Sequence, residues 1–384
     1  MYRRRLVFDA DRESRASEMD YLLIIRCGIV GVACTLAACS SGPNLVGLGE
    51  LDATPVAAEH RIFISSTRRE ADDVSEFLSG ERAESVRFAT VDVTIPLNHQ
   101  PGSIELPRDS SPDPTKHFLI QNPENLKDGE AFISQINNQI RGRAQATKSA
   151  MVFVHGYNTN TTEAITRLAQ IVQDSGYDGI PILFTWPSNR KTIDYVSDIN
   201  SAAFSRDALV DLAFALNRSN LDEFYIIGHS MGGFLVMEAV RSIGLRNQFD
   251  RLSKNSDIIL ASPDIDIDLF GSQIRPLDFE RSKITVLMSQ DDKALQLSQR
   301  IAGDYPRVGA ADPQRLSALG VNVIDLSQVE DTSSAHHSKF SESPEIVRII
   351  GQRINAGDEL STQSTATDLT IQRVGDVLQV FSPG

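Results

Sequence analysis

A serine flanked by glycines lies in the sequence GHSMGG at residues 228–233. A short apolar run, Phe224–Ile227, precedes it, and a segment with the apolar pattern of a buried helix follows it. A serine on so tight a turn from strand to helix has a strained backbone and holds its hydroxyl above the sheet. Side chains two residues before and after the serine would collide, so the turn requires Gly228 and Gly232. This context predicts a nucleophilic serine at Ser230.

A serine hydroxyl is a poor nucleophile without a base, which in such sites is a histidine oriented by an acid. When the serine lies on a strand–turn–helix motif, the chain order is serine, then Asp or Glu, then histidine. Only His336 and His337 follow the serine, and both come after the last expected strand, where the base is required. We predict His337 as the base, with His336 as the alternative. The interpretation without a catalytic role is that the two histidines form a solvated pair on the surface. The remaining histidines are His60, His99, His117, His155 and His229.

The acid is expected directly after a strand that lies between the serine and these histidines. Asp291 and Asp292 follow the apolar run Ile284–Met288, and Asp264 follows the strand before it. We predict Asp292 as the acid, with Asp291 second and Asp264 third. An aspartate at the carboxyl end of a strand is also a common N-cap of the next helix, so the candidates that are not the acid have structural roles. The remaining candidates are Asp266 and Asp268.

An oxyanion hole needs two converging N–H donors. The backbone N–H of Met231, at the start of the expected helix, is one candidate. The second comes from the loop after the strand at 150–154, which begins His155-Gly156-Tyr157. Gly156 permits the tight turn, and the backbone N–H of Tyr157 is the predicted donor. We expect His155 to be a structural hydrogen-bonding residue.

The composition excludes several function classes. The chain has 384 residues, 37 Lys and Arg against 51 Asp and Glu, and a net charge of -14, which argues against nucleic acid as a partner. The three cysteines all lie near the N-terminus, so the rest of the chain has neither a disulfide framework nor a thiolate metal site. The sequence contains no H-E-x-x-H, no G-x-x-x-x-G-K-[ST] and no dinucleotide fingerprint, so we expect no metal and no cofactor.

The N-terminus has the pattern of a targeting segment. Residues 21–38 are apolar except for Arg26, and the apolar stretch after this arginine has the length of a signal-peptide core and is short for a membrane span. The run ends in Leu36-Ala37-Ala38-Cys39, which resembles the bacterial lipobox. In that motif the cysteine is lipidated and begins the mature chain, and a following serine, here Ser40, goes with export to the outer membrane.

We therefore expect residues 1–38 to be a signal segment, with Cys39 lipidated and the protein anchored to a membrane of the bacterial envelope, most simply the outer membrane facing the periplasm. The charged stretch before residue 19 is long for a signal peptide, so Met19 is an alternative start. An uncleaved N-terminal membrane anchor is the alternative to lipidation.

Strand-like runs alternate with helical patterns from residue 150 onward, which indicates a mostly parallel sheet with helices on both faces, an α/β fold. We expect a linker at 39–60, one domain at 61–355 and a tail at 356–384 in which 377–381 have the composition of a further strand. Pro96 favours an edge position for the strand at 91–96. The polar segment 188–200 is either a lid or a plain loop. Further strands are expected at 61–67, 150–154, 181–185, 224–227, 257–261, 284–288 and 321–326, and helices at 131–143, 161–175, 202–216, 293–302 and 344–354.

Six short segments of the chain are distinctive when taken together. They are DVTIPLNHQPGSIELP at 92–107, FVHGYN at 153–158, FTWPS at 184–188, GHSMGG at 228–233, ASPDID at 261–266 and HSKF at 337–340. With them, the chain resembles a bacterial α/β-hydrolase family of unknown function that is esterase- or lipase-like. The resemblance covers roughly residues 60–355 and implies the α/β-hydrolase fold with Ser230 as nucleophile. It favours Asp292 and His337 as the acid and the base and implies no substrate.

The hypothesis from the sequence is a membrane-anchored serine hydrolase that cleaves small-molecule or lipid carboxylic esters through an acyl-enzyme. The nearest alternative is an acyltransferase or thioesterase with the same triad, which differs only in the acceptor that reaches the acyl-enzyme. The alternative from another class is a catalytically silent scaffold protein of the envelope. A glycine-flanked, strained serine favours the enzyme, since it has no evident packing role.

Overall fold

The computed structural model describes residues 44–47, 55–108, 112–142, 148–188, 195–246, 248, 256–277, 283–329, 335–356 and 370–381. These residues all belong to one compact unit, Gly42–Gly384. The predicted signal segment and Cys39 lie outside the described residues. So do most of the predicted linker and residues 189–194 of the polar segment.

The described strands form an 11-stranded sheet. The eight strands from β11 to β1 run parallel to one another, whereas β2, β3 and β10 are attached through antiparallel pairs at the two ends. The predicted α/β fold with a mostly parallel sheet is therefore confirmed. In spatial order the strands are β10 (Thr370–Val374), β11 (Val377–Phe381), β9 (Asn322–Gln328), β8 (Ile284–Met288), β7 (Ser256–Ala261), β6 (Glu223–His229), β4 (Ser149–Val154), β5 (Ile180–Thr185), β1 (Ala58–Glu70), β2 (Leu78–Ile95) and β3 (Leu119–Leu126).

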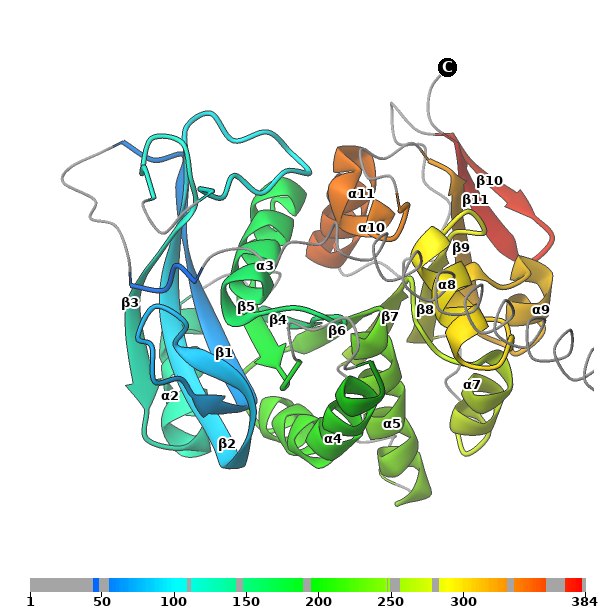
Figure 1. Ribbon diagram of the computed structural model, residues 1–384, viewed down its shortest axis with the longest axis horizontal. Helices are drawn as coiled ribbons and strands as arrows, with labels where there is room; N and C mark the ends of the chain where they lie inside the picture. Colours follow the sequence, from blue (N-terminus) through cyan, green and yellow to red (C-terminus); the bar gives the residue numbers. More distant parts are fainter. Residues whose placement is uncertain are drawn as a thin grey trace, which may run out of the picture. The chain divides into compact units, whose positions relative to one another are not determined.

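Helices cover both faces of this sheet (Figure 1). Helices α3, α10 and α11 lie on one face, and α4, α5 and α7 lie on the other. The described helices are α2 (Gly129–Ile140), α3 (Thr161–Ser175), α4 (Tyr195–Asn217), α5 (Met231–Leu245), α7 (Ile267–Ile274), α8 (Lys293–Ile301), α9 (Pro313–Ser317), α10 (Lys339–Glu342) and α11 (Pro344–Ala356).

Two hydrophobic clusters fill the space between the sheet and its helices, one on each face. Successive side chains of a strand point to opposite faces, so Phe224 and Ile226 of β6 belong to one cluster and Tyr225 and Ile227 to the other. An apolar run without alternation is therefore the right sequence pattern for this central strand.

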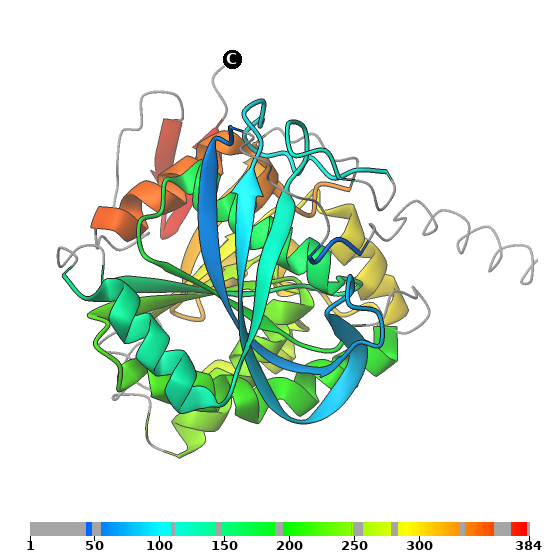
Figure 2. The ribbon, with the colours of Figure 1, turned by 90° about the vertical axis from the view of Figure 1, so that its left-hand side faces the viewer.

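The N-terminal strands differ from the expectation. The strand predicted at an edge because of Pro96 is part of the long β2, which pairs with β1 on one side and with β3 on the other, so the edge prediction is wrong. Pro96 follows the end of β2, and the outer strand is β3, which was not predicted and contains Pro123. Figure 2 shows these three strands side by side at this end of the sheet.

Two further elements extend past the predicted limits. Helix α4 begins at Tyr195, inside the segment expected to be a loop or a lid, and the buried Asp198 of its first turn accepts a 2.6 Å hydrogen bond from Ser188. The strand considered at 377–381 forms as β11 and pairs with β9, so the sheet continues into the C-terminal tail. None of the helices in the described residues is long and apolar enough to cross a membrane.

Candidate active site

The turn between β6 and α5 holds Ser230 in a strained conformation. Its φ of 54° and ψ of −122° are unusual for a residue with a side chain. The Ser230 N–H donates to the carbonyl of Ala261 at the end of β7, 3.0 Å away, and the Ser230 carbonyl accepts from the N–H groups of Gly233 and Asp264. The neighbouring strand thus holds the turn at the carboxyl edge of the sheet, where ligands bind in open α/β folds.

Three glycines allow the chain to pass close to this serine. A Cβ on Gly232 would lie 2.3 Å from the carbonyl oxygen of Val154, and one on Gly228 would lie 2.9 Å from the Cα of Gly233. A Cβ on Gly156 would lie 3.0 Å from the Cβ of Ser230, so the loop after β4 lies directly against the serine. The predicted need for glycine at these positions is therefore steric.

The structure pairs His337 with Asp292. The Nδ1 of His337 donates to Oδ2 of Asp292 over 2.7 Å, and the carboxylate is fully buried. The other oxygen, Oδ1, caps helix α8 by accepting from the backbone N–H of Leu295 at 2.9 Å. One carboxylate is thereby fixed by a helix and in turn fixes one imidazole, which leaves the Nε2 of His337 on the far side of the ring.

This pairing determines the basicity of His337. Burial disfavours its imidazolium, but the charge of Asp292 and the hydrogen bond to it outweigh this effect, so the pKa of His337 is raised above 6.5. The ring also packs against His229, the residue before the serine, at 4.9 Å between centroids. The Nε2–H of His229 donates to the carbonyl of His337 at 3.3 Å, which links the loop of the histidine to the serine turn.

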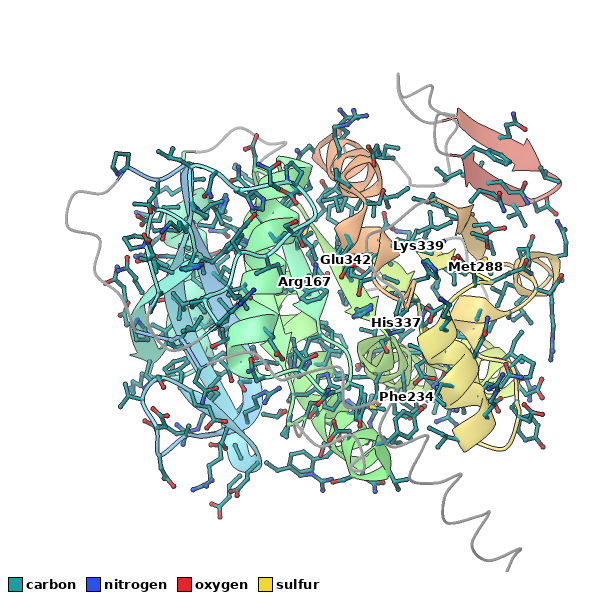
Figure 3. All side chains as sticks on the ribbon, turned by 45° about the horizontal axis from the view of Figure 1, so that its top comes forward. Arg167, Phe234, Met288, His337, Lys339 and Glu342 are labelled. Carbon is teal, nitrogen blue, oxygen red and sulfur yellow. The ribbon has the colours of Figure 1, made fainter. Side chains whose placement is uncertain are left out.

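His229 is itself neutral in this environment. Burial, reinforced by the nearby His337, holds the pKa of His229 well below its usual range. Its ring also packs on Phe340 at 5.0 Å. In Figure 3 the labelled His337 lies between Glu342 of α10 and Phe234 of α5, in the part of the molecule where these elements converge.

The other predicted candidates for the acid have different partners. Asp291 accepts from the hydroxyl of Ser289, and both of its carboxylate oxygens accept from the buried Lys339 ammonium at 2.9 Å. Burial opposes the ionisation of Asp291, but these hydrogen bonds lower its pKa overall. Lys339 also donates to the carbonyls of Leu326 and Ser327, so this pair fastens α10 to the end of β9.

Asp264 lies beside the serine turn but belongs to a buried polar cluster. It accepts from the hydroxyls of Tyr195 at 2.8 Å and Ser298 at 2.7 Å, and its Oδ1 is 3.3 Å from the Nε of Arg307. Burial, with the charge of Asp264, raises the pKa of Tyr195. Asp266 caps α7, and Asp268 pairs with Arg315. The alternative base, His336, adopts a positive φ of 56° directly before His337.

The loop after β4 contains the predicted second donor. Tyr157 follows Gly156 and packs edge-on against Tyr195 at 5.5 Å. His155 is buried and stacks on Trp186 with the two ring planes 9° apart. Burial, with a smaller contribution from the charge of Arg68, lowers the pKa of His155 to about 3, so this imidazole is neutral. The structure thus gives His155 the hydrogen-bonding surroundings expected from the sequence.

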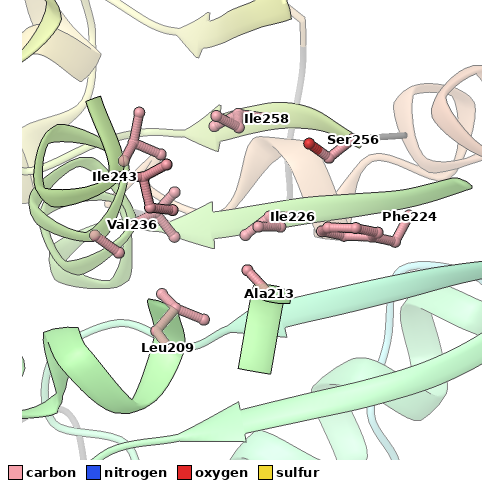
Figure 4. A pocket seen from close by; sticks show the side chains of 10 residues that line it. Leu209, Ala213, Phe224, Ile226, Val236, Ile243, Ser256 and Ile258 are labelled. Carbon is pink, nitrogen blue, oxygen red and sulfur yellow. The ribbon is translucent and has the colours of Figure 1, made fainter. Parts of the chain in front are cut away.

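A small pocket elsewhere in the fold is lined by no histidine and no carboxylate. It lies between α4, α5 and the first halves of β6 and β7, and Figure 4 shows its almost entirely apolar lining. Phe224 is the second residue of β6 and Ser256 is the first of β7, so the pocket is at the opposite end of the strands from Ser230. Within the described residues, no group of three or more His, Cys, Asp or Glu side chains could hold a metal ion.

Sequence reasoning missed several residues that surround the site. Arg68 and Thr185 contact His155, and Lys339 binds Asp291. In the stretch HSKF at 337–340 the lysine lies next to polar residues, so nothing in the sequence marks it as buried. No pattern connects Arg68 to His155, because the two residues are far apart in sequence and meet only through the order of strands in the sheet.

One curated protein is similar to part of the chain. An uncharacterized protein, alr1448 of Nostoc sp., is 25% identical over 142 residues, a match that covers 30% of this chain and 37% of that protein. The present chain therefore spans well under half the length of this curated relative.

The solved structures to which the chain is similar include two esterases. A hyperthermophilic esterase from the archaeon Pyrobaculum calidifontis is 12% identical, with 79% of this chain and 87% of that chain covered and a TM-score of 0.36. The thermostable carboxylesterase EstE1, cloned from a metagenomic library, is 11% identical, with 79% and 90% covered and a TM-score of 0.36.

Residues 130–353 match the model of the family described as alpha/beta hydrolase of unknown function (DUF900). This match covers more than half of the chain and includes the serine turn, both aspartate-bearing strand ends and the histidine loop. The protein is therefore a member of this family of alpha/beta hydrolases.

Proposed function

We propose that the protein is a serine hydrolase that cleaves carboxylic esters through a triad of Ser230, His337 and Asp292. The observation that carries the proposal is the 2.7 Å pair between His337 and the buried Asp292. The ring of His337 packs against His229, the residue directly before Ser230, which has a positive φ. An imidazole held in this way has one ring nitrogen bound to an acid and the other available to a nucleophile.

In the proposed reaction, the Ser230 hydroxyl attacks the acyl carbonyl while the Nε2 of His337 takes its proton. The imidazolium is stabilised by Asp292 and returns the proton to the alcohol, which leaves as the ester C–O bond breaks. Water then attacks the acyl-enzyme by the same route and restores the serine. The N–H groups of Met231 and Tyr157 hold the oxyanion, and the loss of one such donor typically costs about 3–4 kcal/mol of transition-state stabilisation.

Labelling with a fluorophosphonate probe tests this proposal, because the probe reacts only with an activated serine. We expect labelling of the wild type, none of Ser230→Ala, and a loss with His337→Ala but not with His336→Ala. A folded wild type that is not labelled would contradict an active serine hydrolase and favour the silent scaffold. A product assay with added alcohols or thiols distinguishes ester hydrolysis from acyl transfer.

We also propose that Cys39 carries a lipid that anchors this domain to the bacterial envelope. The support is the sequence Leu36-Ala37-Ala38-Cys39 after an apolar stretch of signal-peptide length. Metabolic labelling with a tagged fatty acid is expected to mark the wild type and not Cys39→Ala. An unlabelled wild type that still sediments with membranes would favour an uncleaved anchor instead.

A further inference from the structure

His155 is held by contacts that define where its proton lies. The backbone N–H of Trp186 lies 3.2 Å from the Nε2 of His155. A backbone N–H only donates, so Nε2 must be an acceptor. In a neutral imidazole the proton is then on Nδ1, which lies 2.9 Å from the carbonyl oxygen of Gly156 and donates to it.

Two side chains from other strands support the same arrangement. The Thr185 hydroxyl is 2.9 Å from Nε2 of His155, and the Nε of Arg68 donates to this hydroxyl at 2.8 Å. Because the hydroxyl oxygen accepts from arginine, its own hydrogen is free to point at Nε2. The guanidinium, the hydroxyl and the imidazole therefore form a directional chain that ends at the Gly156 carbonyl.

Arg68 is rigidly placed for this role. It is 1% exposed and comes from β1, which pairs with β5, the strand that ends at Thr185. Its Nη2 donates to the carbonyl of Thr159 at 2.6 Å and lies 3.4 Å from Nε2 of His155, while Nη1 donates to the carbonyl of Ser79 at 3.3 Å. The buried cation also opposes protonation of His155, which preserves the acceptor at Nε2.

The carbonyl at the end of this chain belongs to the same peptide unit as the N–H of Tyr157. A trans peptide is planar, and its C=O and N–H point in opposite directions, so fixing one fixes the other. Gly156 has no side chain to add further restraint, and the unit lies directly against Ser230. The hydrogen bond from His155 to the Gly156 carbonyl therefore fixes the direction of the Tyr157 N–H on the opposite side of the peptide unit.

We propose that Arg68, Thr185 and His155 are positioning residues that aim the Tyr157 N–H at the oxyanion. The inference rests on the proposed function for its effect on rate, but the hydrogen-bond arrangement stands on its own. None of the three touches substrate; each acts through the peptide between residues 156 and 157.

The test compares Thr185→Val, which replaces a buried hydroxyl by a methyl group of similar size, with Thr185→Ser, which keeps the hydroxyl. Thr166→Val is the matched control, because Thr166 is equally buried and its hydroxyl donates to a backbone carbonyl at 2.8 Å within α3. Two quantities are measured on the full-length protein: the tautomer of His155 from nitrogen-15 shifts of labelled histidine, and the rate constant for fluorophosphonate labelling. A His155→Gln sample assigns the resonance.

We expect the wild type to hold His155 neutral with the proton on Nδ1. We expect Thr185→Val to lose part of this tautomer and to react about 10- to 100-fold more slowly, since complete removal of an oxyanion donor costs about 100- to 1,000-fold. For an ester substrate the loss is expected in kcat with KM little changed, because the oxyanion forms only in the transition state. Thr185→Ser is expected to recover most of the rate, and Thr166→Val to keep it.

Several results would overturn the proposal. A wild-type His155 that is charged or carries its proton on Nε2 at neutral pH rules it out without any variant. So does a folded Thr185→Val that reacts as fast as Thr166→Val. If Thr185→Val does not fold, Arg68→Lys replaces it, because lysine keeps the charge but cannot reach three acceptors with one fork. If the wild type is unreactive but shows the expected tautomer, the proposed function fails while the positioning arrangement stands.

Discussion

Replacing Asp292 by asparagine separates the two tasks that one carboxylate performs. Asparagine can keep the oxygen that caps α8 through Leu295, so the helix should remain in place. The other end of the side chain, 2.7 Å from Nδ1 of His337 in the wild type, becomes an NH₂ group that cannot accept. We expect His337 then to turn its lone pair toward residue 292 and to carry its proton on Nε2. In the proposed reaction, this tautomer could not take the proton of Ser230.

The expected size of this effect follows from the loss of the correct tautomer. In serine proteases the equivalent change lowers kcat about 10,000-fold, so we expect kcat/KM or the labelling rate of Asp292→Asn to fall by about three to four powers of ten. At 1.36 kcal/mol for each factor of ten, this is about 4–5.5 kcal/mol of transition-state stabilisation.

The pH dependence gives a second, independent readout. In the wild type the raised pKa of His337 places the acidic limb of kcat/KM above pH 6.5. Without the carboxylate, burial is opposed only by the smaller contributions from the charges of Asp264 and Glu342, so the limb is expected to move to lower pH in the variant. Stopped or continuous assays with a chromogenic ester across the range in which histidine titrates measure both the plateau and the limb.

Asp291→Asn is the control for this experiment. It removes the ion pair with Lys339 and is expected to lower the free energy of unfolding by about 1–2 kcal/mol, a value discounted because Asp291 is 43% exposed. Its pH limb should stay where it is in the wild type. If Asp291→Asn loses the rate and Asp292→Asn retains it within a few-fold, the assignment of the acid is refuted.

Two further changes test the packing of the serine turn and a buried histidine that lies between two carboxylates. Gly232→Ala would place a Cβ 2.3 Å from the backbone carbonyl oxygen of Val154. We therefore expect the unfolding free energy to fall by about 1–3 kcal/mol and little soluble protein to be obtained. Normal stability in chemical denaturation would contradict this steric explanation. His99 lies between Glu105 and Asp174 at 2.8 Å from each; burial lowers its pKa, but the hydrogen bonds to these carboxylates raise it overall. This stabilisation is therefore complete below pH 6.5 and lost as pH rises through the higher pKa of the folded state. His99→Gln should lower the melting temperature most at acidic pH, by an amount worth about 1–3 kcal/mol, and a pH-independent loss would count against a charged His99.

The local signals in the sequence were sufficient for the centre of the fold. Apolar runs and glycine spacing predicted the strand and turn around Ser230, because a buried parallel strand and a tight turn leave marks in adjacent residues. Chain order reduced the choice of base to His336 and His337, and the structure pairs the second of them with Asp292. The adjacent pairs Asp291 and Asp292, and His336 and His337, could not be separated from the sequence alone. Neighbouring residues of the same type point in different directions, and the local composition does not reveal which one faces the site.

The distant contacts could not be predicted in the same way. Strand β3 has polar residues and Pro123 within it, and its pairing with β2 depends on long-range register that no local pattern encodes. Arg68 was indistinguishable from a surface arginine in the run Thr67-Arg68-Arg69, because a β-bulge irregularity in the pairing of β1 with β2 lies at this point. The inward direction of one arginine and the outward direction of the next follow only from the folded strand.

The position of β1 has a practical consequence for anyone who prepares this protein. The family match begins at residue 130, whereas β1, β2 and β3 all precede it. A chain shortened to the matched residues would leave β5 as an open edge, with unpaired backbone groups along Phe184 and its neighbours that invite strand addition from other molecules. Boundaries drawn from family similarity would thus yield an aggregating fragment, and a soluble preparation should begin ahead of Ala58.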